Sequence, residues 1–252
     1  MAARERVRAP RRIRPGTAGD RRPGATVRVA ILSTGPEEWA GVDLESGAFV
    51  RARPPRDGGA AVGGRWAMFD VARLEVAHDD EPPDPARPEA VALASEPEHA
   101  GQLRRGTARR LLAQLATRDQ GRRPILGTHG PSTAYVDLDR SAPSVALLSV
   151  DPRSIRCSER PDGQVICAFS WAGITITLPL LDARARAAVA ARGGELDGSF
   201  LAAVAGGRPG YLLVALGAVR RGHAPKVVLS VVAKRPARRP RAPRRELRAP
   251  RS

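Results

Sequence analysis

The segment YLLVAL, residues 211–216, indicates the fold class of this 252-residue chain. Every side chain after Tyr211 in this segment is apolar. Successive side chains of a β-strand point to opposite faces of a sheet, so a run without polar positions predicts a strand that is covered on both sides. Residues 226–232 (KVVLSVV) are equally rich in valine and predict a further strand.

Shorter runs of this kind precede it in the second half of the chain. Runs of β-branched and aromatic residues between turn-forming residues are typical of short strands. An Ala172-Gly173 turn joins two of the runs, and an Ala/Arg-rich segment at residues 182–192 predicts a short helix. The expected strands are residues 134–138, 144–150, 154–158, 165–171 and 174–179.

The first half has a similar density of strands. We expect strands at residues 27–33 (VRVAILS), 41–45 and 48–53, with one or two more within residues 65–77. Ser46-Gly47 is a two-residue hairpin signal. A helix is expected after Thr107, whose side-chain oxygen can cap it. Its apolar stripe is Ala108, Leu111, Leu112 and Leu115, with Arg109 and Arg110 pointing away to solvent.

Two sets of five or more short strands predict a mainly β protein of two tandem small barrels with one or two short helices. The acidic, Pro-rich residues 79–90 (DDEPPDPARPEA) favour a linker or an extended crossover. We expect the first barrel at residues 26–98, and a linking helix with the second barrel at residues 99–233. The halves do not align as a sequence repeat, which leaves the boundary near residue 98 open.

The basic charge of the chain lies at its two ends. Residues 1–25 carry +6 and residues 234–252 carry +8, out of +16 in all. Both tails are mixtures of Arg, Ala and Pro, which predicts disorder because little apolar surface can be buried. Such arms attract polyanions by releasing counterions from phosphates. A GC-rich coding sequence explains the same composition, as does a start codon assigned too far upstream in the case of the N-terminal tail.

Two cysteines, Cys157 and Cys167, are too few for a disulfide framework. They flank an expected hairpin turn at Asp162-Gly163, where buried thiols are favoured over a disulfide or a metal pair. No stretch approaches the roughly 20 apolar residues of a membrane span. The N-terminus lacks the apolar region of a secretory signal, so we expect a cytoplasmic protein of bacterial type.

No catalytic motif is recognisable, which favours a non-enzymatic protein without a metal or cofactor. The segment GTHGPS, residues 127–132, could approach a phosphate with His129 as a base. An ordinary turn is the favoured interpretation, because no strand-to-helix context follows it. A cation site at Asp79, Asp80, Glu81 and Asp84 is disfavoured by the prolines between them.

Aromatic residues beside basic residues on the expected strands favour contact with nucleic acid. Single strands bind such barrels on aromatic platforms, where each stacked base contributes about 1–3 kcal/mol. Large aromatic residues on strands are also common in cores, and that alternative stays open. The candidate nucleic-acid contacts are Arg51, Arg53, Trp66, Trp171, Arg220, Arg221 and Lys226.

From Phe169 onward the sequence has the pattern Phe169-x-Trp171-x-Gly173, followed by a strand that ends at Asp182. This pattern resembles the bacterial dual OB-containing domain, which has an aromatic-x-aromatic-x-Gly turn and a strand ending in Thr-Asp-Pro. Residues 211–217 and 226–228 look like its closing pair of strands. Residues 27–33 and 49–51 fit its first barrel, and residues 87–89 (RPE) resemble its His-Pro-Glu segment.

The resemblance covers about residues 26–233 and implies two OB-like barrels. It also implies the role proposed for that family, the recognition of nucleic acid in bacterial conflict systems. The chain departs from the pattern at Ala215, where the family has Ser, at Leu181 and Ala183 around Asp182, and at Arg87 in place of His. Any ligand contact of those polar residues is therefore altered here.

We predict a non-enzymatic module that binds single-stranded DNA or RNA through strand faces and loops, with the tails adding sequence-independent attraction. OB barrels also bind proteins and oligosaccharides. The alternative is a protein-interaction or sensor module of a multi-protein defence system, in which nucleic-acid affinity comes from the tails alone. An enzyme ranks third. The sequence leaves the base preference, the protein partners and the oligomeric state open.

Overall fold

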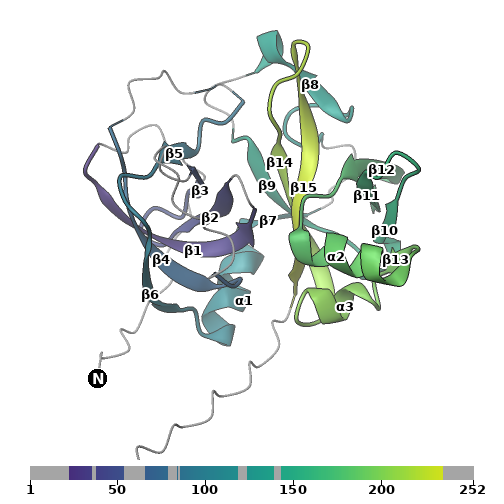
Figure 1. Cartoon of the computed structure of the whole chain (residues 1–252), viewed down its shortest axis with the longest axis horizontal. Coiled ribbons are helices and arrows are strands. Elements are labelled where there is room, and N and C mark those ends of the chain that lie inside the picture. The colour runs from purple at the N-terminus through teal and green to yellow at the C-terminus, as the bar shows by residue number, and fades with distance from the viewer. Residues whose placement is uncertain are drawn as a thin grey trace, which may run out of the picture.

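The apolar runs of the sequence form three hydrogen-bonded sheets in the computed structural model (Figure 1). The structure describes residues 23–35, 38–53, 66–78, 84, 86–118, 124–138 and 143–234. Within this part of the chain, fifteen strands and three α-helices make the protein mainly β, as the sequence predicts. Most of both tails lies outside the described residues, as do Asp79, Asp80 and Glu81 of the acidic segment.

The first half forms a six-stranded sheet in which β1 and β2 lie at the centre. The sheet has the order β5-β3-β2-β1-β4-β6, with only the β3–β5 pair parallel. Along β1, Val29 and Ile31 enter one apolar cluster while Ala30 and Leu32 enter another, so both faces of the sheet are covered. The strands are β1 (Thr26–Thr34), β2 (Trp39–Asp43), β3 (Phe49–Arg53), β4 (Asp70–Glu75), β5 (Ala90–Ala92) and β6 (Glu98–Gln102).

The second half forms a five-stranded and a four-stranded sheet. Their orders are β7-β9-β14-β15-β8 and β12-β11-β10-β13. The β11–β12 hairpin turns at Ala172 and Gly173, both with positive φ, as expected. The strands are β7 (Ala116–Arg118), β8 (Ser132–Ala134), β9 (Val145–Ser149), β10 (Arg156–Glu159), β11 (Val165–Trp171), β12 (Ile174–Pro179), β13 (Leu196–Asp197), β14 (Pro209–Leu216) and β15 (His223–Ala233).

Strand β14 is buried along its whole length, which confirms the prediction from its composition. Leu212 and Val214 belong to the core of the second half, whereas Leu213 and Ala215 belong to a cluster that contains residues of both halves. Because alternate side chains point to opposite faces, this one strand is the wall between the two cores. The division into barrels at residues 26–98 and 99–233 stays a prediction.

Helix α1 (Arg105–Leu115) lies at the junction of the halves. Leu111 and Leu112 are fully buried in the shared cluster, together with Leu32 of β1, Leu147 of β9 and Leu213 of β14. The apolar stripe of this helix is therefore as predicted. Its start is not, because the helix begins after Arg104 and Thr107 lies buried inside it without capping.

Leu103 gives the reason for the earlier start, since its N–H still bonds to the carbonyl of Phe69 beside β4. The chain therefore leaves the sheet at Arg104 and coils at once. The other two helices, α2 (Ala183–Arg192) and α3 (Leu201–Val204), lie beside β15 on the side of the second half (Figure 1). Helix α2 matches the predicted Ala/Arg helix. No helix among the described residues is long and apolar enough to span a membrane.

One expected strand was placed wrongly. Residues 134–138 were predicted as a strand, but β8 ends at Ala134 and Tyr135–Asp137 form a 3-10 turn. The Tyr135 N–H bonds to the carbonyl of Gly222, so the chain is held at the tip of the β14–β15 hairpin rather than along a strand.

Candidate functional site

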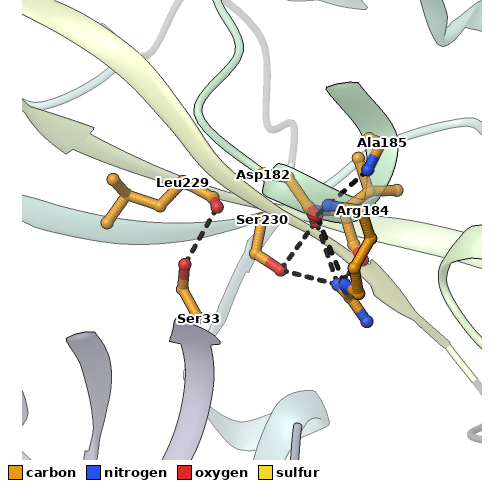
Figure 2. Close-up of polar contacts among 7 residues, drawn as sticks. Ser33, Asp182, Arg184, Ala185, Leu229 and Ser230 are labelled. Carbon is orange, nitrogen blue, oxygen red and sulfur yellow. Dashed lines mark hydrogen bonds and ion pairs between the residues drawn. The ribbon is translucent and has the colours of Figure 1, made fainter. Parts of the chain in front are cut away.

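A cleft of about 710 Å3 lies between the two halves of the chain. One wall consists of β1, the segment before β4, the end of β6 and the start of α1; the other consists of α2, α3 and β15. The Ser33 hydroxyl on β1 donates a hydrogen bond of 2.9 Å to the carbonyl of Leu229 on β15, which ties the walls together (Figure 2). The volume falls in the range of about 300–1,000 Å3 typical of small-molecule sites.

Asp182 anchors the second wall. Its carboxylate caps α2 by accepting from the backbone N–H groups of Arg184 and Ala185, and it also accepts from Ser230 Oγ and the Val231 N–H on β15 (Figure 2). The Arg184 guanidinium binds the same carboxylate at 2.9 Å. Asp182 is 4 % exposed. With all these donors in place, Asp182 holds α2 against the sheet.

The charge of the cleft is positive. Among the described residues, its charged lining residues are Arg104, Arg105, Arg184 and Asp182, of which only the saturated Asp182 is acidic. Arg104 and Arg105 are exposed and have no acidic partner within the part of the chain that the structure describes. They belong to a run, residues 99–118, that holds five arginines and no Asp or Glu. An anion entering the cleft therefore meets guanidinium groups from both walls.

Three aromatic rings lie in series beside the cleft. Trp66 lines the cleft, with its ring centroid 5.3 Å from that of Trp39 and 5.6 Å from that of His99. The Trp66 and His99 rings are stacked, with an interplanar angle of 25°. Trp39 is buried, whereas the His99 side chain is 58 % exposed. The series therefore runs from the core of the first sheet to solvent.

Phe69, on the same wall, has an unusual backbone conformation. Its φ is 70°, a region that bulky residues rarely adopt and that costs about 1–3 kcal/mol. Two backbone hydrogen bonds hold it there, from its N–H to the carbonyl of Ile31 and from the Leu103 N–H to its carbonyl. These bonds place Phe69 between β1 and the residues that lead into α1.

The residues predicted as nucleic-acid contacts do not gather at one site. Trp66 lies at the cleft, Arg53 is half-buried at the end of β3, and Arg220 and Arg221 are exposed at the tip of the β14–β15 hairpin. For these four the role stays a prediction. The other three, Arg51, Trp171 and Lys226, are only 1–2 % exposed, which does not leave a face on which a base could stack or a phosphate could bind.

Arg51 and its partners form a buried polar network between the two halves. The Arg51 guanidinium binds the Glu38 carboxylate and donates to the carbonyl of Leu216 at 2.8 Å and to Ser144 Oγ at 3.2 Å. Ser144 in turn donates its N–H and its hydroxyl to the Glu89 carboxylate, each at 2.5 Å. Glu89 is 1 % exposed. The residue predicted to contact nucleic acid thus connects β3 to the end of β14.

Lys226 holds the segment GTHGPS in place. Its ammonium donates to the carbonyls of Thr128 at 2.6 Å and Gly130 at 2.7 Å. Its backbone N–H donates to the carbonyl of Pro131. The segment is a turn, as favoured, and His129 is exposed on it. Burial lowers the pKa of Lys226 from 10.5 to about 8.

The shifted pKa of Lys226 predicts a pH dependence of stability. Between pH 8 and 10.5 the unfolded chain keeps a proton that the folded chain has lost. The free energy of unfolding should therefore rise with pH across this window, by up to about 1.4 kcal/mol per pH unit. We expect this rise in urea titrations of the wild type and not in Lys226→Met, in which the other titrating groups are unchanged. Parallel pH profiles for the two proteins would contradict the assignment.

Cys157 and Cys167 lie directly opposite each other on β10 and β11, and both are free and fully buried. The pKa of the Cys167 thiol is raised well above its ordinary value. The largest cause is its hydrogen bond with Cys157, and the second is its burial. The predicted pair of buried thiols on adjacent strands is confirmed. The described residues include no group of three or more His, Cys, Asp or Glu side chains that could hold a metal ion.

The fold and the cleft define a mainly β protein with an arginine-lined site between its halves. Comparisons with known protein families, with curated proteins and with solved structures find no match for this chain. The resemblance to the dual OB-containing domain therefore stays a prediction.

The sequence pattern missed the residues that define the cleft. Arg104 and Arg105 come before the apolar stripe of α1 in the sequence, and Arg184 belongs to a helix composed mainly of Ala and Arg. Neither sequence context indicates a binding site. One available signal was the absence of any acidic residue from 99 to 118. Solvated arginines on a helix explain that run equally well, and only the packing of the halves distinguishes the two interpretations.

Proposed function

We propose that this protein is a non-enzymatic nucleic-acid-binding module of two OB-like barrels, which binds single-stranded DNA or RNA. The observation that supports it is the charge of the cleft. In the described part of the chain, three arginines line it, and the one carboxylate there is already saturated by donors. Phosphates bound by such groups release counterions, and this release drives association.

A protein-interaction module is the second candidate. Val136 is 90 % exposed and Tyr135 is 38 % exposed on the 3-10 turn beside the β14–β15 hairpin. Exposed apolar side chains that lie together are typical of contact surfaces. In this case the Arg-rich tails supply any affinity for nucleic acid.

The test is fluorescence anisotropy of labelled single-stranded DNA and RNA, with the full-length chain and with residues 26–233, across roughly 50 to 200 mM salt. We expect the shortened chain to keep binding near physiological salt, because the cleft arginines lie within it. If binding requires the tails and is abolished by salt, the proposal fails and the interaction module becomes the favoured function.

A further inference from the structure

We infer that the cleft is a site for one nucleotide unit, with its phosphate held by Arg104, Arg105 and Arg184 and its base stacked beside Trp66 and His99. The unit is either a free nucleotide or part of a single strand, since both present the same chemistry. If the unit is part of a single strand, this site rests on the proposed function and specifies where the strand binds.

The phosphate end is defined by arginines from both walls. Arg104 and Arg105 extend from the start of α1, and Arg184 extends from the first turn of α2. The Nε and Nη2 atoms of Arg184 bind Asp182, and Nη2 also contacts Ser230 and the carbonyl of Val231. Among the described residues its Nη1 has no hydrogen-bond partner, so one edge of a fixed guanidinium is left for a ligand.

The base end lies at the edge of the cleft, where Trp66 lines it and His99, outside the lining, stacks on Trp66. Trp39 supports Trp66 from the core, and His99 stacks on Trp66 with more than half of its side chain exposed. A ring held by its neighbours loses little conformational entropy when a base stacks on it, and such stacking tolerates any base. Gln102 lines the cleft nearby with its amide nitrogen bonded to Asp70 at 3.1 Å. Its oxygen is then an acceptor for an exocyclic amino group.

The size of the cleft agrees with a single unit. About 710 Å3 matches sites for small molecules and leaves no room for a duplex. The cleft lies between the starts of α1 and α2, which belong to different halves of the chain. A phosphate bound there would therefore bridge the halves, as the Ser33–Leu229 hydrogen bond already does. The unit would thus contact residues far apart in the sequence.

The test uses the full-length chain at roughly 200 mM salt, where attraction by the tails is weakened. One double variant, Arg104→Ala with Arg105→Ala, removes two of the three cleft arginines. Two single variants, His99→Ala and Trp66→Leu, remove ring stacking. The matched control is Arg109→Ala with Arg110→Ala, which removes the same charge from the same helix outside the cleft lining. Thermal unfolding verifies that each variant is folded.

The probes are a labelled single strand, with AMP and inorganic phosphate as competitors. We expect the Arg104/Arg105 pair to lose about tenfold or more in affinity, and His99→Ala to lose about fivefold or more, with the control little changed. Competition by AMP, stronger than by phosphate, identifies a free nucleotide as a ligand. Binding of the strand without competition by AMP identifies the strand as the source of the unit.

Two results would overturn the inference in different ways. If the cleft variants bind the strand as the wild type does, while the Arg109/Arg110 control is weakened, the site lies on the outer face of α1 and the proposed function survives. If neither the strand nor AMP binds the full-length chain at this salt, the proposed function fails together with the cleft.

Discussion

Replacing Arg51 with alanine is expected to lower the free energy of unfolding by about 3–5 kcal/mol. The side chain is 1 % exposed and connects Glu38 on one side to Leu216 and Ser144 on the other. Removing one member of a buried ion pair is costly because the other charge stays buried without its partner. Of its described partners, Glu38 would keep only Arg87, at 3.4 Å.

Urea unfolding of Arg51→Ala measures this loss, and Arg73→Ala is the control. Arg73 pairs with Glu98 at 3.5 Å, but both side chains are largely exposed, and such surface pairs contribute about 0–1 kcal/mol. Arg51→Lys adds a further comparison, since lysine keeps the charge but lacks the planar fork that reaches several acceptors. Equal effects of Arg51→Ala and Arg73→Ala would show that the network does not stabilise the fold. Any loss of nucleic-acid affinity in Arg51→Ala must be corrected for unfolding.

Trp171→Ala is expected to destabilise the second half to a similar degree, by about 3–5 kcal/mol. The indole is 2 % exposed and packs in the cluster with Phe169, Leu178 and Val214. It also lies next to the tight β11–β12 turn, where it pairs with Ile174. Truncation leaves a cavity. The hairpin cannot easily collapse to fill it, because the turn holds its two strands in place.

The measurement is chemical unfolding followed by circular dichroism, with Phe200→Ala as the control. Phe200 is 46 % exposed, and the Arg192 guanidinium lies 3.4 Å above its ring, so its loss should cost about 0.5–1 kcal/mol. Under conditions in which Trp171→Ala is folded, we expect it to bind single strands as the wild type does. A stable Trp171→Ala protein that has lost affinity would instead restore Trp171 as a ligand contact.

The cleft and the buried network give the junction of the halves two different roles. On one side, Arg51, Glu89 and Ser144 are fully engaged with each other and with the chain. On the other side, Arg104 and Arg105 have no acidic partner among the described residues. Cations without an acidic partner attract anions, whereas removing one member of a satisfied buried network leaves the others unpaired. We therefore propose that the cleft binds the ligand and that the network stabilises the fold.

Local pattern predicted most of the strands and failed where tertiary contacts define them. The boundaries of β11 and β12 match their predicted residues, because alternation and the Ala172-Gly173 turn are local properties. Strand β6 (EHAGQ) has no such alternation and is a strand because β4 offers it hydrogen bonds. The Thr107 cap was wrong for the same reason, since the bond from Leu103 to Phe69 sets the start of α1.

By itself, the sequence determined the mainly β fold, the burial of β14 on both faces, the α2 helix and the paired thiols, since each depends on neighbours along the chain. Only the tertiary structure decided which cations are buried. Arg51 and Lys226 look like surface residues in sequence, yet carbonyl and carboxylate oxygens brought from distant segments solvate them. Packing of the halves likewise decided that Arg104, Arg105 and Arg184 face one cleft. The proximity of residues about 80 positions apart depends on that packing and has no signature in local composition.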